Sequence, residues 1–420
     1  MTAATTMPRT VSLAALVGQF APGERVFLPG SAGEIPALTE ALFSPAAPPL
    51  NITASFVPGI NRVPLERLPQ GATFASMFAQ PTIPQAQEQG RFRHLPLSYG
   101  GFANYLRHRA SFDTCIVHVA PPDADGRCSL GVAVEFTPIA AARSRRIVAF
   151  VNRQMPSLPG ADVIRLGDID LVVENDAPLC TYDVGTASQQ ANLIASHVAA
   201  FIGDGAVLQI GLGKVPDALL RQLTGRRGLR LHSGMLSDGA KALAQAGSLD
   251  RDWLHTSCVH VGTSDYYAWL AERTDFAVRA CDHTHAASLL AALPCLMAVN
   301  SALSVDLFGQ ANLEMLDGHM VSGVGGAADF SRGASLSPGG ASIIALPATT
   351  GKGQASRIVP ALNGPSSIPR HDVDIIVTEF GAADLRDCSA IQRAEKIIAI
   401  AAPQHQSALQ DAWRAMAMRL

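Results

Sequence analysis

The chain has 420 residues, 48% of them hydrophobic and 16% charged, so it can bury a large core, and its length predicts two or three domains. Its net charge of -3, from 32 basic and 35 acidic residues without long runs, excludes the electrostatic footprint of a protein that binds nucleic acid or an anionic membrane surface. The absence of a secretory signal, of about 18 consecutive apolar residues and of C-x-x-C spacing among seven cysteines predicts a cytoplasmic protein with reduced thiols and no membrane span.

Apolar runs typical of strands recur along the chain, and helical patterns follow several of them. Strands that alternate with helices predict an α/β fold with mainly parallel sheets. In chain order the runs are ERVFLPG at 24–30 with helix ALTEALF at 37–43, CIVHVAP at 115–121, RRIVAFVN at 145–152, DIDLVV at 168–173, AVLQIGLG at 206–213 with helix DALLRQL at 217–223, ASIIALP at 341–347 and DVDIIVTEFG at 372–381.

One phrase occurs twice. The segments at 21–42 and 203–223 both read glycine, turn, apolar strand, small-residue turn, proline and helix. The repetition predicts two tandem related open α/β domains. A polar, turn-rich stretch, ENDAPLCTYDVGTASQQ at 174–190, marks the boundary, so we expect domains at 1–185 and 186–420.

Several longer motifs are specific to one family. They are APPDADGRCSLGV at 120–132, LQIGLGKVPDALL at 208–220, LHSGMLSDG at 231–239, VNSALSVDLFGQAN at 299–312, SGVGGAADFSRGA at 322–334, SRIVPAL at 356–362 and VTEFGAADLR at 377–386. With these motifs the chain resembles the acetyl-CoA hydrolase/transferase family of class I CoA-transferases, especially the 4-hydroxybutyrate and butyryl-CoA types. The resemblance implies a CoA-transferase-like fold of two α/β domains, coenzyme A or acyl-CoA as substrate held mainly by the C-terminal domain, an acyl or CoA acceptor, and a homo-oligomer, commonly a homodimer.

Glycines after the second repeat's strand are candidates for binding the coenzyme. Gly211 and Gly213 follow the strand and Pro216 lies in the first helical turn, so backbone amides can approach an anionic or carbonyl group. The alternative is an ordinary tight turn between a strand and a helix.

A second glycine-rich run, Gly323-Val324-Gly325-Gly326, exposes backbone amides where a side chain could not fit. Such donors stabilise a thioester carbonyl as it becomes an oxyanion. The resemblance assigns this role to Gly326, and we expect Gly325 to act beside it. Gly323 and Gly326 are also candidates for binding the coenzyme. The alternative is a loop whose glycines serve packing alone.

The family's catalytic glutamate has no counterpart. The resemblance implies a glutamate that attacks the acyl-CoA, forms an acyl anhydride and then a glutamyl-CoA thioester. Its motif here reads His232-Ser233-Gly234-Met235, with glycine in the glutamate's place. The family's nearby asparagine, in an Asn-His-Pro stretch, falls in the altered segment at 281–287. Gly234 is therefore expected to leave a void of about a glutamate side chain beside the thioester.

Other groups near these two motifs could supply the chemistry, and the candidates are His255, Cys258, His260, Cys281, Asp282, His283 and His285. His283 or His285 could act as general base, with Asp282 orienting the imidazole. A cysteine could instead carry an acyl thioester, and each residue could also be purely structural. Two histidines of an H-x-H pair lack a third ligand, so no metal is predicted. Glu379 is expected to be structural, and nothing in the sequence favours Glu314 as a nucleophile.

These observations favour an acyl-CoA thioester-processing enzyme that performs direct acyl transfer or hydrolysis. Three alternatives remain: conventional CoA transfer between carboxylates, decarboxylation of a CoA-bound acid, and a non-catalytic acyl-CoA-binding subunit. Calorimetric CoA binding without turnover would favour the last, and release of carbon dioxide the decarboxylase. The segment at 89–106 is expected to line the acyl side of the site.

Overall fold

The computed structural model describes residues 7–80, 84–351 and 355–418, and they divide into two compact units. Unit 1 contains the chain up to Tyr182 together with Leu254–Thr284, and unit 2 contains Asp183–Trp253 together with the chain from His285 onward. The first division lies close to the expected boundary at 185. The segment 254–284 departs from the expected scheme, because it packs with unit 1 although it belongs to the second half of the chain.

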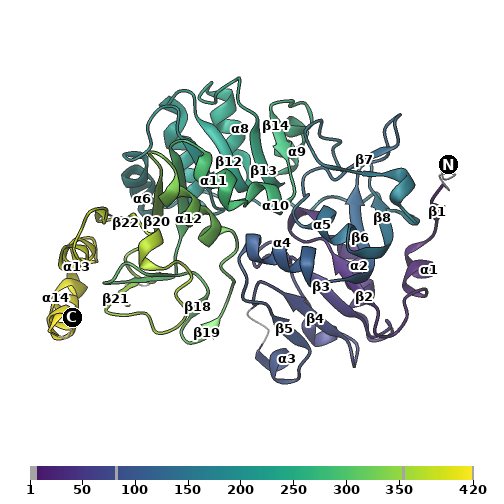
Figure 1. Ribbon diagram of the computed structural model, residues 1–420, viewed down its shortest axis with the longest axis horizontal. Coiled ribbons are helices and arrows are strands. Elements are labelled where there is room, and N and C mark those ends of the chain that lie inside the picture. The colour runs from purple at the N-terminus through teal and green to yellow at the C-terminus, as the bar shows by residue number, and fades with distance from the viewer. Residues whose placement is uncertain (1–6, 81–83, 352–354, 419–420) are drawn as a thin grey trace. The chain divides into compact units, whose positions relative to one another are not determined.

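Unit 1 is built on a sheet in which every neighbouring pair of strands is parallel (Figure 1). In spatial order its strands are β1 (Arg9–Thr10), β10 (Leu171–Glu174), β8 (Ser144–Val151), β6 (Phe112–Val119), β2 (Arg25–Leu28), β3 (Asn51–Ala54), β4 (Thr73–Ser76) and β5 (Phe92–His94). The chain builds this sheet outward in both directions from the adjacent strands β2 and β6, so the connections that follow these two strands run toward opposite edges of the sheet. Ligand sites of open parallel sheets form where the connections change direction in this way.

Unit 1 also contains helices and shorter strands. The helices are α1 (Leu13–Val17), α2 (Pro36–Leu42), α3 (Pro84–Glu88), α4 (Tyr99–His108), α5 (Thr137–Ala141), α9 (Ser264–Ala271) and α10 (Cys281–Thr284). Two further pairs are the antiparallel β7 (Arg127–Ser129) with β9 (Val163–Arg165) and the parallel β13 (His255–His260) with β14 (Phe276–Val278). Helix α4 begins at an N-cap, because the Ser98 side chain accepts a hydrogen bond from the Gly101 amide.

Unit 2 contains a second mainly parallel sheet. Within this unit the strand order is β12 (Arg230–Leu236), β11 (Val207–Ile210), β15 (Leu296–Ser301), β20 (Ala341–Ala345), β22 (Ile375–Thr378) and β23 (Gly381–Asp384), and only the last pair is antiparallel. Strand β20 is buried along its whole length, as expected for a parallel strand covered by helices on both faces. The smaller strands are β16 (Ser304–Asp306), β17 (Ala311–Asn312), β18 (Met315–Leu316), β19 (His319–Met320) and β21 (Ile358–Val359).

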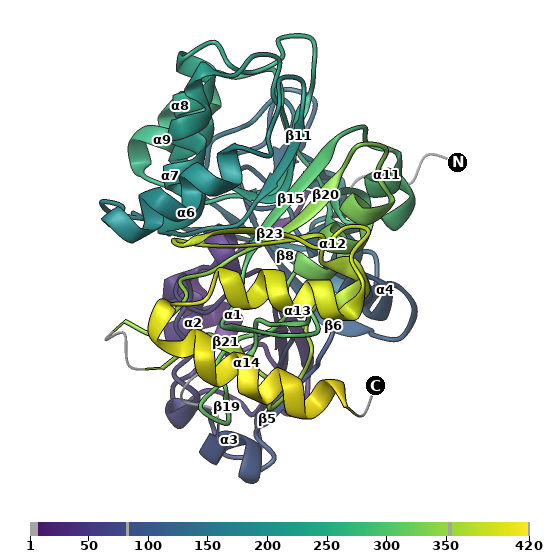
Figure 2. The same cartoon turned by 90° about the vertical axis from the view of Figure 1, so that its left-hand side faces the viewer.

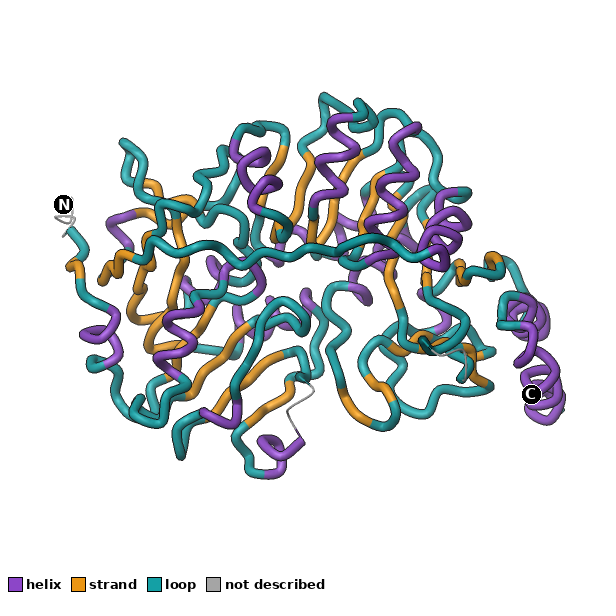
Figure 3. Tube along the Cα trace, turned by 180° about the vertical axis from the view of Figure 1, so that it is seen from behind, coloured by secondary structure: helices purple, strands orange, loops and turns teal. Residues whose placement is uncertain are grey.

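Helices cover both faces of the unit 2 sheet. Figure 2 shows α6 (Gln189–Ala199), α7 (Lys214–Gln222) and α8 (Asp238–Gln245) on one side of the strands, and α11 (Ala287–Ala292) and α12 (Ala327–Leu336) on the other. The last two helices, α13 (Ala390–Ala399) and α14 (Pro403–Ala417), pack against each other, and the alternation of strands and helices can be followed in Figure 3.

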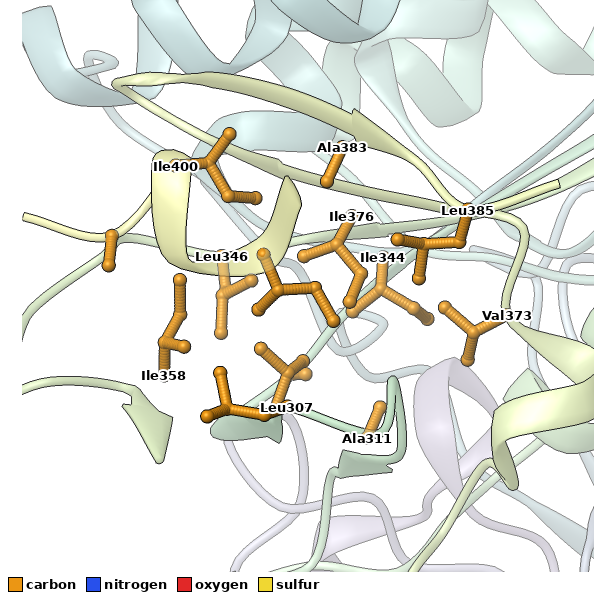
Figure 4. Close-up of a cluster of buried hydrophobic side chains, with 14 of the residues drawn as sticks. Leu307, Ala311, Ile344, Leu346, Ile358, Val373, Ile376, Ala383, Leu385 and Ile400 are labelled. Atoms are coloured by element: carbon orange, nitrogen blue, oxygen red, sulfur yellow. The ribbon is translucent and has the colours of Figure 1, made fainter. Parts of the chain in front are cut away.

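A large apolar cluster stabilises the C-terminal part of unit 2. Figure 4 shows that β20 and β22 contribute Ile344 and Ile376, while Leu307 and Ile358 come from the three-stranded β17-β16-β21 region. All four are fully buried. Burying one such side chain stabilises a fold by about 1.5–3 kcal/mol, so the cluster anchors the small strands to the main sheet.

The expected strands and helices are confirmed. Each apolar run contains a strand, the two repeated phrases form β2 followed by α2 and β11 followed by α7, and the sheets are mainly parallel. Within the described ranges, no helix is both long enough and apolar enough to cross a bilayer.

Candidate active site

The motif with Gly234, where the resemblance predicts a glutamate, lies on β12 beside the end of the neighbouring strand β11. The Ser233 hydroxyl donates to the Ile210 carbonyl at 2.9 Å, and the Ile210 amide lies 3.3 Å from the same hydroxyl oxygen. This buried serine fastens the end of β12 to the end of β11. Gly234 follows it directly, at the carboxyl edge of the sheet where parallel α/β folds place their ligands.

The turn after β11 has the geometry that its glycines predict. Gly213 has φ +127°, which a side chain would oppose, and it is the N-cap of α7. A Cβ on Gly211 would meet no described atom within 4 Å. Pro216 is buried in the first turn of the helix. Only Gly213 is therefore explained by the turn itself, and the open space beside Gly211 suits the approach of a ligand.

The glycine-rich run ends at the start of α12. Gly325 has φ +58° and Gly326 is the N-cap of this helix. Among the described residues, neither amide donates to a backbone acceptor. The first amides of a helix carry partial positive charge and lack partners within the helix. Gly326, as the N-cap, therefore has an amide without a partner within the helix, and Gly325 lies directly before it.

His285 lies against both glycine motifs. A Cβ built on Gly234 would be 3.2 Å from the His285 Nε2 atom, and a Cβ on Gly326 would collide with the same nitrogen. The Phe330 ring of α12 packs edge-on to the imidazole, with ring centroids 4.8 Å apart. His285 is 3% exposed. The fold thus places one buried imidazole beside both Gly234 and Gly326.

The expected void at Gly234 needs correction. The space where a side chain would begin is bounded by His285, and Phe330 lies 3.7 Å from the same Cβ position. A glutamate at 234 would have to pass the imidazole. The altered segment at 281–287 therefore contributes the group that fills part of the space.

The other two members of the expected base arrangement lie elsewhere. His283 is exposed on the short helix α10, unlike His285. The Asp282 carboxylate, expected to orient an imidazole, forms an ion pair with Arg107 of α4. That pairing is a correction to the expected role of Asp282, because a guanidinium is the stronger partner for a carboxylate.

Two nearby histidines have structural environments. His260 is fully buried, its Nδ1 atom lies 2.6 Å from the Tyr266 hydroxyl, and burial lowers the pKa of His260 to about 3. A histidine that stays neutral throughout the physiological range is a weak proton acceptor. His255 is fully buried and packs against the Phe276 ring. Both side chains belong to the packing of β13 and β14.

The two glutamates considered as substitutes already have partners. Glu379 accepts hydrogen bonds from the Ala348 amide at 2.9 Å and the Gln190 side chain at 2.7 Å. Glu314 accepts one from the Ser367 hydroxyl at 2.6 Å. These contacts support structural roles for both glutamates.

Sequence reasoning did not single out Glu135. This residue is 3% exposed, has φ +40° and accepts hydrogen bonds from the Ser55 and Tyr99 hydroxyls at 3.1 and 3.2 Å. Burial raises the pKa of Glu135 to about 7. The detectable signal was one carboxylate inside the apolar run at 130–136, since buried acids are rare without a specific reason.

Comparison with known proteins decides the family. Residues 9–181 match the acetyl-CoA hydrolase/transferase N-terminal domain, and residues 262–413 match the C-terminal domain of that name. The chain belongs to the acetyl-CoA hydrolase/transferase family. Members of this family are enzymes that process acyl-CoA thioesters, and this chain is one of them.

Individual relatives agree with the family assignment. The chain is 34% identical to the 4-hydroxybutyrate coenzyme A transferase of Clostridium kluyveri, over 78% of this chain and 79% of the relative. Among solved structures, RipA from Yersinia pestis superposes with a TM-score of 0.89 at 30% identity, covering 97% of each chain. A 4-hydroxybutyrate CoA-transferase from Porphyromonas gingivalis gives a TM-score of 0.79 at 28% identity, covering 97% of this chain and 98% of the other.

Proposed function

We propose that this member of the acetyl-CoA hydrolase/transferase family transfers or hydrolyses the acyl group of an acyl-CoA directly, with His285 as general base. The observation that carries the proposal is the position of the His285 Nε2 edge against Gly234 and Gly326. No carboxylate is needed at position 234 if water or an acceptor nucleophile attacks the thioester itself.

The positions of these groups support the following steps. The Gly325 and Gly326 amides receive the thioester oxygen, and Gly211, Gly213, Pro216 and Gly323 line the approach of the coenzyme. His285 takes the proton of the attacking water or acceptor while the carbonyl carbon becomes tetrahedral. The C–S bond then breaks, the oxyanion returns to a carbonyl, and the proton held by His285 passes to the CoA thiolate. A general base contributes about 10²–10⁴-fold and each oxyanion donor about 10²–10³-fold.

Conventional CoA transfer between carboxylates is the second candidate. It is favoured by the relatives, whose names include a 4-hydroxybutyrate CoA transferase. It would require a protein carboxylate to attack the thioester, and Glu379 and Glu314 are held by the hydrogen bonds described above.

Trapping the intermediate separates the two candidates. Incubation with an acyl-CoA, rapid quenching and mass spectrometry of the intact protein should reveal no glutamyl-CoA adduct, and borohydride should reduce no glutamate. Detection of such an adduct, with turnover between carboxylates, would replace direct transfer by the conventional mechanism. The matched pair His285→Ala and His283→Ala identifies the base independently.

We further infer a cytoplasmic homodimer that needs no metal. Support comes from the absence of a helix able to span a bilayer in the described part of the chain and from the resemblance to CoA-transferases. Light scattering after size exclusion should give twice the 44.0 kDa of one chain, and a chelator should leave turnover unchanged.

A further inference from the structure

Two cysteine sulfurs lie close together in the interior of unit 1. The Sγ atoms of Cys258 on β13 and Cys281 at the start of α10 are within 4.8 Å of each other, and both side chains are fully buried. A disulfide needs about 2.0 Å between the sulfurs. Side-chain rotation can supply much of the remaining approach when the two backbones are already neighbours.

The backbones are held at this spacing by one short segment. The amides of Val134 and Glu135 both donate to the Cys258 carbonyl at 3.1 Å, and the Cys281 amide donates to the Glu135 carbonyl at 2.8 Å. Residue 135 therefore connects β13 to the start of α10 through main-chain hydrogen bonds. The connection keeps the backbones of the two cysteines close to each other.

Two other titratable groups lie near the two thiols in the interior of unit 1. Burial raises the pKa of Tyr99, and the neighbouring Glu135, Cys258 and Cys281 raise it further. Tyr99, Glu135 and the two cysteines therefore form one buried cluster. Glu135, with a pKa of about 7, is partly ionised near neutral pH and can accept a proton from this cluster.

We propose that hydrogen peroxide converts Cys258 and Cys281 to a reversible disulfide that switches the enzyme off. One thiol gives its proton to the Glu135 carboxylate, and its sulfur attacks the peroxide O–O bond, forming a sulfenic acid. The proton and the departing hydroxide become water. The second thiol attacks the sulfenic sulfur, the S–S bond forms as the S–O bond breaks, and a second water leaves. Two thiols and one peroxide thus give one disulfide and two waters.

The consequence for turnover follows from the position of the pair. Helix α10 ends at Thr284, directly before His285. Drawing Cys281 toward β13 moves the start of this short helix and with it the imidazole, whose packing against Gly326 leaves little room for displacement. The loss of turnover rests on the proposed function, whereas formation of the cross-link does not.

Peptide mapping tests the cross-link on the unaltered protein. After peroxide treatment, alkylation and trypsin, we expect the peptide at 252–273, with Cys258, joined to the peptide at 280–332, with Cys281 and Cys295. The mass should fall by about 2 Da. Turnover should fall at least tenfold and return with a reductant. Recovery of both peptides alkylated and unjoined would overturn the proposal, and so would a cross-link that leaves turnover unchanged.

Single substitutions assign the second sulfur. The control Cys295→Ser removes an exposed thiol on the same peptide and should keep both the cross-link and the inactivation. Cys281→Ser and Cys258→Ser should lose the cross-link and keep their own untreated rate after peroxide. If either variant is still inactivated by peroxide, or if Cys295→Ser abolishes the cross-link, the assignment is wrong.

Discussion

Gly326→Ala is the sharpest test of the position of His285. Gly326 has φ -87° and ψ -2°, a conformation that any residue adopts, so alanine brings no backbone strain. Alanine also reduces the conformational entropy of the unfolded chain, which by itself would stabilise the fold by about 0.4–1 kcal/mol. The new methyl group, however, would collide with the His285 ring. Overpacking of this kind typically costs about 1–3 kcal/mol. The net loss in the free energy of unfolding should therefore be about 1–2 kcal/mol.

The same substitution in a His285→Ala background should behave differently. Without the imidazole the methyl group enters the space that the ring vacates, so Gly326→Ala should be neutral or stabilising by up to about 1 kcal/mol. The difference between the two backgrounds is a coupling energy of about 1–3 kcal/mol. Urea denaturation followed by the fluorescence of Trp253 and Trp413, both in unit 2, measures it.

A matched control lies on the same helix. A Cβ on Gly333 would come within 2.5 Å of Leu290 instead of His285, so Gly333→Ala should cost the same free energy in both backgrounds. Equal costs for Gly326→Ala in both backgrounds would refute the placement of His285. If the cost of Gly333→Ala also differed between the two backgrounds by the same amount, His285→Ala would be shown to disturb the whole of α12.

Three further outcomes are expected. His285→Ala should lower kcat by about a hundredfold or more, whereas His283→Ala, at an exposed position, should stay within about threefold in the same assay. The pKa of Glu135 is about 7 in the folded protein and 4.5 in the unfolded chain, so the unfolded chain loses this proton at lower pH. The free energy of unfolding of the wild type should therefore fall by about 3 kcal/mol between pH 4.5 and pH 7. Urea denaturation of Glu135→Gln over the same pH range should lack this decrease. Glu379→Ala leaves the Ala348 amide without its acceptor, so it should lower the free energy of unfolding by about 1–2 kcal/mol while turnover persists. A folded Glu379→Ala variant without any turnover would instead indicate that Glu379 is a nucleophile.

The sequence by itself determined the fold class and part of each sheet, since its apolar runs correspond to β2, β6, β8 and β10 in unit 1 and to β11, β20 and β22 in unit 2. Runs such as AVLQI and ASIIA become buried parallel strands because strand burial depends on local apolar patterning, which a linear reading detects. The turn at Gly213 was also readable, since its backbone conformation is one that glycine tolerates and other residues resist. The long motifs identified the family for the same reason, because each is a contiguous string.

Only the tertiary structure decided which groups meet. His283 and His285 are two residues apart and chemically identical, yet Phe330 and the two glycines select His285 as the buried one. The pairing of Asp282 with Arg107 joins residues 175 positions apart. Such choices depend on packing between segments that are distant along the chain, and spacing in the sequence carries no information about which side of a turn faces inward. Which of the two imidazoles is buried is therefore a property of the fold.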